Sequence, residues 1–155
     1  MRKLLLLITI FVTSFVGATS VSDIELSELV KTSDHIIIGQ IIKVDMIDED
    51  GRQITDPEAR TGPGGPNEIR LHIEVVENGI VKTTGDKELA KLTIPLWKMW
   101  HYSLGSWKGV EMETAIFMLK GEKYERAYPG HFLRDESDLP EIKRLLSELK
   151  TQNNK

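Results

Sequence analysis

The chain has 155 residues, a formal net charge of −4 and no cysteine. This length is enough for one domain with a real hydrophobic core. An acidic chain without a basic cluster argues against nucleic acid and anionic membranes as partners. The absence of cysteine excludes disulfides, thiolate zinc sites, cysteine nucleophiles and a lipidated N-terminal cysteine.

Residues 1–18 are predicted to be a signal peptide. Arg2 and Lys3 provide a positive start, residues 4–15 are mostly apolar, and residues 16–18 (VGA) fit a signal-peptidase site. The apolar run is shorter than the ~20 residues of a membrane-spanning helix, and an uncleaved N-terminal anchor is the alternative. We expect cleavage after Ala18, a mature chain without a membrane span, and a periplasmic or secreted location. An exported chain without disulfides fits a bacterial cell envelope.

The strongest strand signal covers residues 35–47, which are rich in β-branched side chains. Because strand side chains alternate, one face is expected to carry Ile36, Ile38, Ile42, Val44 and Met46. Gly39 lacks a β-carbon and is expected to bend this strand. Before the strand, Ser22 and Glu25 have capping-box spacing, which predicts a short helix over residues 23–31.

The middle of the chain is predicted to consist of strands separated by turns. Residues 48–67 read as a loop, and residues 68–76 alternate as a half-buried strand does. Asn78-Gly79 indicates a turn, with Ile80-Val81 as an extension of the strand beyond it. Residues 89–97 are predicted to form a further strand, which Pro95 places at a sheet edge or at the strand's end.

The last third is predicted to end in a helix. Residues 112–120 read as a central strand, and residues 123–133 as a fifth strand or a pair of short ones. An apolar stripe over residues 139–149 behind Asp138 predicts a helix, followed by a frayed tail at 151–155. We therefore expect one domain over residues 19–150. Its predicted fold is mainly β: a five-stranded, OB-like antiparallel barrel with a short N-terminal helix and a C-terminal amphipathic helix.

Five segments carry a resemblance to a known group of proteins. They are residues 26–34 (LSELVKTSD), 36–44 (IIIGQIIKV), 73–79 (IEVVENG), 115–119 (AIFML) and 130–133 (GHFL). Together they resemble a group of uncharacterised exported bacterial proteins, with Asn78 in place of a usual lysine. The resemblance covers about residues 24–133 and rests on structural motifs.

That group is similar in layout to the netrin/TIMP-like OB barrels. Metalloprotease inhibitors of this class chelate zinc through an N-terminal cysteine, which this chain lacks. The resemblance therefore implies a fold and a compartment, and it implies no chemistry.

Searches for catalytic and metal-binding patterns give no candidate. The four histidines, His35, His72, His101 and His131, have no ligand spacing, and His72 reads as solvated surface. The acidic residues of the 48–67 loop do not fit an EF-hand register around Gly51. No nucleophile elbow or phosphate loop is present. We therefore expect no catalytic residue, no metal and no cofactor.

The candidate site is an aromatic segment that contains all three tryptophans of the chain. Its candidate binding residues are Trp97, Trp100, His101, Tyr102 and Trp107. Exposed aromatic side chains can stack on sugars or anchor a partner protein. Buried ones would instead plug the barrel, and this second interpretation is favoured because large aromatics are more often buried. Within the segment, we expect Trp107 to be exposed and Trp97 to be buried.

These observations favour an exported, non-catalytic binding or interaction module of the bacterial cell envelope, with a protein or carbohydrate partner. Two other functions stay open. One is a hydrolase whose site is assembled only in three dimensions, which would require a pocket that gathers histidines and carboxylates. The other is a protease-inhibitor-like module, which would require a wedge of loops at one end of the barrel.

Overall fold

The computed structural model describes residues 23–153, so the predicted signal peptide and its cleavage site lie outside the described residues. The described chain contains the following elements in order: α1 (Leu26–Thr32), β1 (His35–Ile47), β2 (Gln53–Ile54), β3 (Glu68–Lys82), β4 (Lys91–Pro95), α2 (Leu104–Lys108), β5 (Thr114–Lys120), β6 (Glu125–Arg126), β7 (Leu133–Arg134), a 3-10 helix (Glu136–Asp138) and α3 (Leu139–Asn153).

The predicted mainly β fold with antiparallel pairing is confirmed. The strand order is β4-β3-β1-β5-β6, and β2 pairs with β1 while β7 pairs with β5. The sheet has seven strands and is not closed into a barrel, which corrects the predicted five-stranded barrel. The predicted fifth strand is divided into β6 and β7, two-residue strands separated by Pro129 and by Gly130, which has φ +82°. Such a short edge cannot provide a continuous pairing surface for β4.

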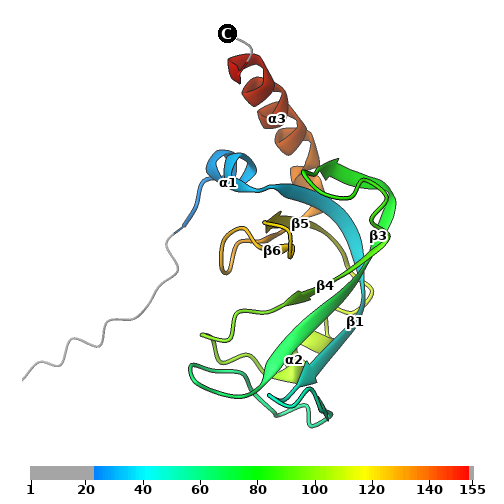
Figure 1. Ribbon diagram of the computed structural model, residues 1–155, viewed down its shortest axis with the longest axis vertical. Helices are drawn as coiled ribbons and strands as arrows, with labels where there is room; N and C mark the ends of the chain where they lie inside the picture. Colours follow the sequence, from blue (N-terminus) through cyan, green and yellow to red (C-terminus); the bar gives the residue numbers. More distant parts are fainter. Residues whose placement is uncertain (1–22, 154–155) are drawn as a thin grey trace, which may run out of the picture.

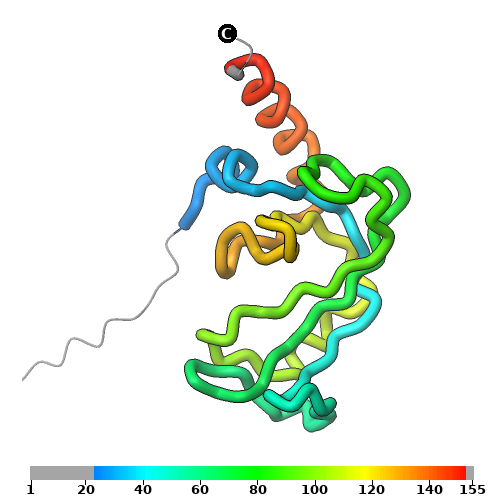
Figure 2. Tube along the Cα trace, in the orientation of Figure 1, coloured from blue at the N-terminus to red at the C-terminus, as the bar shows by residue number. Residues whose placement is uncertain are grey.

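The long strands β1 and β3 curl together along their whole length (Figure 1), and Figure 2 traces the same curl in the backbone. At Gly39 the two strands approach closely: a β-carbon there would lie 2.4 Å from Ile73 Cγ2 and 3.0 Å from the Glu74 carbonyl oxygen. The register between the strands also shifts next to this glycine. The bounds predicted for β1 and the special role of Gly39 are thus confirmed.

The predicted alternation of β1 is wrong beyond Ile41. A register shift between Ile41 and Lys43 leaves Ile42 as an extra residue, and such a bulge reverses which face the following side chains use. The larger core cluster therefore takes four residues from β1: Ile37, Ile41, Val44 and Met46. Ile36 and Ile38 lie instead in a second cluster with Leu29 and Val30 of α1 and Ile142 of α3.

The two clusters lie on opposite faces of the sheet. The larger one fills the inside of the curl, and α1 and α3 cover the other face at one end of the molecule (Figure 1). The predicted central strand is confirmed as β5, whose Ile116, Phe117, Met118 and Leu119 are all fully buried. Pro95 ends β4, which is an edge strand as predicted.

The predicted turn at Asn78-Gly79 is wrong and the predicted extension of the strand over Ile80-Val81 is confirmed, because β3 continues to Lys82. Asn78 has φ +57°, and a β-carbon at Gly79 would lie 2.4 Å from the carbonyl oxygen of Ile38. The pair therefore forms an irregularity inside the strand, where glycine permits close contact with β1.

The helices differ from the prediction at their ends. α1 begins at Leu26, three residues later than predicted, and its N-cap residue Glu25 makes no side-chain capping bond, while Ser22 of the predicted capping box lies outside the described residues. At the C-terminal end of α1, the Lys82 ammonium group donates to the carbonyls of Val30 and Ser33. α3 continues through the predicted frayed tail to Asn153. Among the helices formed by residues 23–153, none has the length and apolarity needed to cross a membrane.

Candidate functional site

The aromatic segment follows β4 and is held by the loop that precedes β3. Thr61 is 2% exposed, and its hydroxyl donates to the Trp100 carbonyl (2.6 Å) and accepts from the Tyr102 amide (3.2 Å). The Thr61 amide also donates to the Tyr102 carbonyl (2.9 Å). The predicted structureless loop is therefore a scaffold for the candidate site. It also contains the short strand β2, which pairs with the end of β1.

A short helix, α2, fixes the far end of the segment. Ser103 is its N-cap and accepts from the Ser106 amide (3.3 Å). The Leu104 amide donates to the Ala59 carbonyl (3.0 Å), and the Gly105 amide donates to the Pro57 carbonyl (2.9 Å). The aromatic segment is thus hydrogen-bonded at both ends, and its aromatic side chains have defined positions.

Four aromatic rings form one continuous row. The ring centroids of Trp97 and Trp100 lie 5.6 Å apart, those of Trp100 and Tyr102 also 5.6 Å, and those of Tyr102 and Trp107 5.4 Å. The rings are inclined to each other by 57°, 71° and 82°, which are tilted and edge-to-face arrangements. We call these four residues the aromatic row.

The aromatic row has an inner and an outer half. Tyr102 and Trp107 pack against the larger core cluster, whereas Trp97 and Trp100 are partly buried and belong to neither cluster. Met99, which lies between Trp97 and Trp100 in the sequence, is 51% exposed. The expected order is therefore reversed: Trp107 contacts the core, and Trp97 lies farther from it. The row is partly a plug and partly a surface.

His101, the fifth candidate residue, does not join the row. It is exposed and lies against the backbone of Gly62, where a β-carbon would be 2.6 Å from His101 Nδ1. Sequence reasoning missed Gly130, which contacts Trp100: a β-carbon at Gly130 would lie 2.7 Å from Trp100 Cη2. The Gly-His-Phe motif predicted a strand there, and nothing in it pointed to a tryptophan more than twenty residues earlier in the chain.

Arg126 of β6 is a second residue that sequence reasoning missed. Its pairing with Leu119 places its side chain on the face of the larger core cluster, near Tyr102. Burial lowers the pKa of Arg126 and raises the pKa of Tyr102. Arg126 Nη1 is buried and has no hydrogen-bond partner among the described residues. A partly buried cation therefore lies near Tyr102 in the inner half of the aromatic row.

A separate group of charged side chains surrounds Asp45, which is 4% exposed. Arg70 donates to it from Nε (2.8 Å) and Nη2 (2.9 Å), and Lys43 Nζ lies 3.3 Å away. His72 Nε2 lies 2.9 Å from Asp45 Oδ2, and His72 Nδ1 lies 3.2 Å from Thr93 Oγ1. Burial raises the pKa of Asp45, but Arg70, His72 and Lys43 outweigh this effect and lower it to about 2.

This hydroxyl–imidazole–carboxylate order does not make a catalytic triad. Thr93 is exposed, and Asp45 is already bound by two cations, Arg70 and Lys43. The group is an ion-pair network on the sheet. The interpretation of His72 as solvated surface is corrected, because its side chain is only 26% exposed and contacts Asp45.

The other histidines do not converge either. His35 is buried, with Nδ1 2.8 Å from Thr83 Oγ1 and Nε2 3.0 Å from the Gly121 carbonyl, and its ring lies 4.4 Å from Tyr124. His131 contacts Tyr128 (5.9 Å between ring centroids). Within residues 23–153, no group of three histidine or acidic side chains could hold a metal ion.

Comparison with protein-family models gives no match, and comparison with curated proteins gives none either. Function therefore has to be inferred from the geometry of the aromatic row.

Proposed function

We propose that this chain is an exported, non-catalytic binding module of the bacterial cell envelope, and that it binds its partner through Trp97, Met99 and Trp100. One observation carries the proposal: the inner half of the aromatic row packs against the core while the outer half is partly exposed. An anchored row fixes the outer rings before binding, so little conformational entropy is lost when a partner covers them.

A protein is the partner that best fits this surface. The Trp97 and Trp100 rings are inclined by 57°, so they form a notch rather than the flat platform that a sugar ring stacks on. Met99 is flexible and adapts to irregular apolar surfaces. Partly exposed tryptophans are also the residues that most often dominate the energy of protein interfaces. A carbohydrate is the second candidate, since each ring alone can stack on a sugar.

Export rests on the charged and apolar character of residues 1–18, and the absence of cysteine in an exported chain then favours a bacterial cell envelope. The netrin/TIMP-like OB layout is part of the same proposal, in the sense of a curled antiparallel sheet with helices at one end. The hydrolase and the protease-inhibitor-like module have weaker support. The histidines of the described chain are dispersed, which weakens the hydrolase. The loop beside the aromatic row is hydrogen-bonded to it through Thr61, which weakens the inhibitor-like wedge of loops.

The test compares three forms of the protein as bait in an extract of its own cell envelope, with bound material measured after cross-linking. The forms are the wild type, Trp97→Ala/Trp100→Ala, and Met112→Ser, which alters a methionine that is 64% exposed and lies outside the row. We expect the wild type and the Met112→Ser form to retain the same protein and the double variant to lose it. Equal retention by all three would remove the aromatic row as the site, and retention of glycan alone would favour a carbohydrate partner.

A further inference from the structure

The C-terminal half of β3 has an unpaired edge. On β1, the edge that faces away from β3 pairs with β5 at one end and with β2 at the other, and between them Ile41 bonds the backbone around Glu113. On β3, pairing with β4 ends where the Val75 amide donates to the Ala90 carbonyl (2.8 Å). Among residues 23–153, no further backbone hydrogen bond reaches that edge as far as Lys82. Backbone donors and acceptors there are free to pair with another strand.

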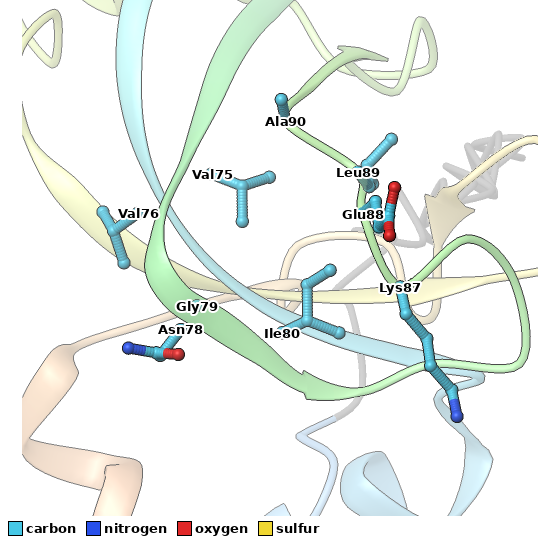
Figure 3. A pocket seen from close by; sticks show the side chains of 9 residues that line it. All are labelled: Val75, Val76, Asn78, Gly79, Ile80, Lys87, Glu88, Leu89 and Ala90. Carbon is cyan, nitrogen blue, oxygen red and sulfur yellow. The ribbon is translucent and has the colours of Figure 1, made fainter.

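A groove follows this edge. Its first hollow, of about 490 Å³, lies between β3 and the loop that leads to β4, and Figure 3 shows Val75, Ile80 and Leu89 around it. A second hollow of about 360 Å³ shares Ile80 with the first. A third hollow, of about 600 Å³, shares Val81, Leu146 and Lys150 with the second. The three hollows therefore form one groove along β3, whose other wall is the loop before β4 at the first hollow and α3 at the second and third.

The groove is basic although the chain is acidic. Lys143 and Lys150 lie two turns apart on the α3 wall, both are exposed, and neither has an ion-pair partner among the described residues. Lys31 and Lys82 line the third hollow, Lys31 near Glu28 and Lys82 bonded to α1. The carboxylate that lines the groove is Glu88, in the first hollow. Apolar side chains, Ile80, Val81 and Leu146 among them, line the groove between these charges.

We propose that this groove binds an extended, acidic segment of a partner polypeptide, which adds to β3 as a further strand. The free strand edge selects an extended backbone, because backbone hydrogen bonds form there only with another strand. Alternate side chains of the bound segment point to opposite faces, so apolar ones reach Ile80 and Leu89 in the first hollow while acidic ones reach Lys143 and Lys150 on α3. This site is separate from the aromatic row and does not depend on it.

The test selects a phage-displayed library of random peptides on the purified protein. The best peptide is then titrated by fluorescence anisotropy against the wild type, against Lys143→Glu/Lys150→Glu, and against the matched control Lys120→Glu/Lys123→Glu, which changes two exposed lysines outside the groove. Hydrogen exchange of the backbone amides of residues 80–82 is measured with and without the peptide. Vesicles that contain phosphatidylglycerol are titrated as a separate probe.

We expect peptides in which acidic and apolar residues alternate, and affinity at least about tenfold weaker in the Lys143→Glu/Lys150→Glu variant. The control should bind like the wild type, and the amides of residues 80–82 should exchange more slowly with peptide bound. The proposal is overturned by selection without acidic enrichment, by equal affinity for the two charge-reversed forms, or by unchanged exchange on β3. Binding of the vesicles alone would also overturn it and indicate a lipid ligand.

Discussion

Arg70 donates two parallel hydrogen bonds to the carboxylate of Asp45, from Nε at 2.8 Å and from Nη2 at 2.9 Å. The two residues face each other across the pairing of β1 with β3, where Asp45 is almost fully buried. A bidentate pair of this kind holds the register of two strands as well as adding energy. The stability of the fold at low pH therefore depends on whether the carboxylate of Asp45 stays ionised.

The Asp45 pKa predicts an acid-sensitive contribution to stability. The folded-state pKa is about 2, below the ordinary aspartate value of 3.8, so the stabilisation is fully present above pH 3.8. It is lost as the pH falls through about 2, because the carboxyl is then protonated in the folded state too. Urea unfolding of the wild type and Asp45→Asn should therefore show a difference in free energy of unfolding of about 3 kcal/mol at neutral pH. That difference should shrink below pH 3.8.

The matched control is Asp50→Asn, whose carboxylate forms an exposed ion pair with Arg52. Removing that pair should change the free energy of unfolding by less than about 1 kcal/mol at any pH. A difference between wild type and Asp45→Asn that stays constant from pH 7 to pH 2 would show that the ionised form of Asp45 contributes nothing.

A second prediction concerns the contact of Gly39 with Ile73. Gly39→Ala should destabilise the protein by about 1–3 kcal/mol, because its β-carbon would overlap Ile73 Cγ2. In the variant Gly39→Ala/Ile73→Ala the overlap is absent, so the two effects should not add. Thermal unfolding of the four forms gives the coupling. Strict additivity would show that steric overlap with Ile73 is not the reason for glycine at this position.

A third prediction concerns Lys82, which joins β3 to the C-terminal end of α1. Lys82→Met keeps the apolar stem of the side chain and removes its hydrogen-bond donor. The carbonyls of Val30 and Ser33 then lose this donor, which should lower the free energy of unfolding by about 1–3 kcal/mol. Lys82→Arg retains a donor and should lose less. The free energy of unfolding in urea measures both. Equal stability of Lys82→Met and the wild type would remove the proposed role of this lysine at the helix end.

Local patterns in the sequence were sufficient for several elements. β-Branched composition predicts the full length of β1, Pro95 predicts the end of an edge strand, and the apolar stripe over residues 139–149 predicts α3. Each of these depends on the residues of one segment and their spacing. The general place of the aromatic residues could also be predicted, since they lie close together along the chain.

Features that depend on distant partners could not be predicted. The bulge at Ile42 becomes visible only when β1 is paired with β3, and it reverses the faces of the later residues. Asn78-Gly79 has the composition of a hairpin turn, but the pairing of Ile80 with Ile37 keeps it inside a strand. The hydrogen bond from Thr61 to the Trp100 carbonyl joins residues 39 positions apart, so no local sequence pattern predicts it.

The split of the aromatic row predicts different costs for its tryptophans. Trp107→Ala removes a ring that packs against the core and should cost about 3 kcal/mol in free energy of unfolding. Trp97→Ala removes a ring outside both core clusters and should cost about 1 kcal/mol, mostly through its contact with Trp100. Denaturant unfolding of the two variants compares them directly. A larger loss for Trp97→Ala would show that the sequence-based expectation was right and the assignment of inner and outer halves wrong.

The accessibility of the outer tryptophans tests the central claim most directly. Three variants, each with two of the three tryptophans changed to Phe, report on Trp97, Trp100 and Trp107 separately by fluorescence quenching with iodide. We predict strong quenching of Trp97 and Trp100, weak quenching of Trp107, and protection of the first two when the captured partner is added. If all three are shielded equally, or if the partner leaves Trp97 and Trp100 as open to iodide as before, the aromatic row is a plug and not a binding surface.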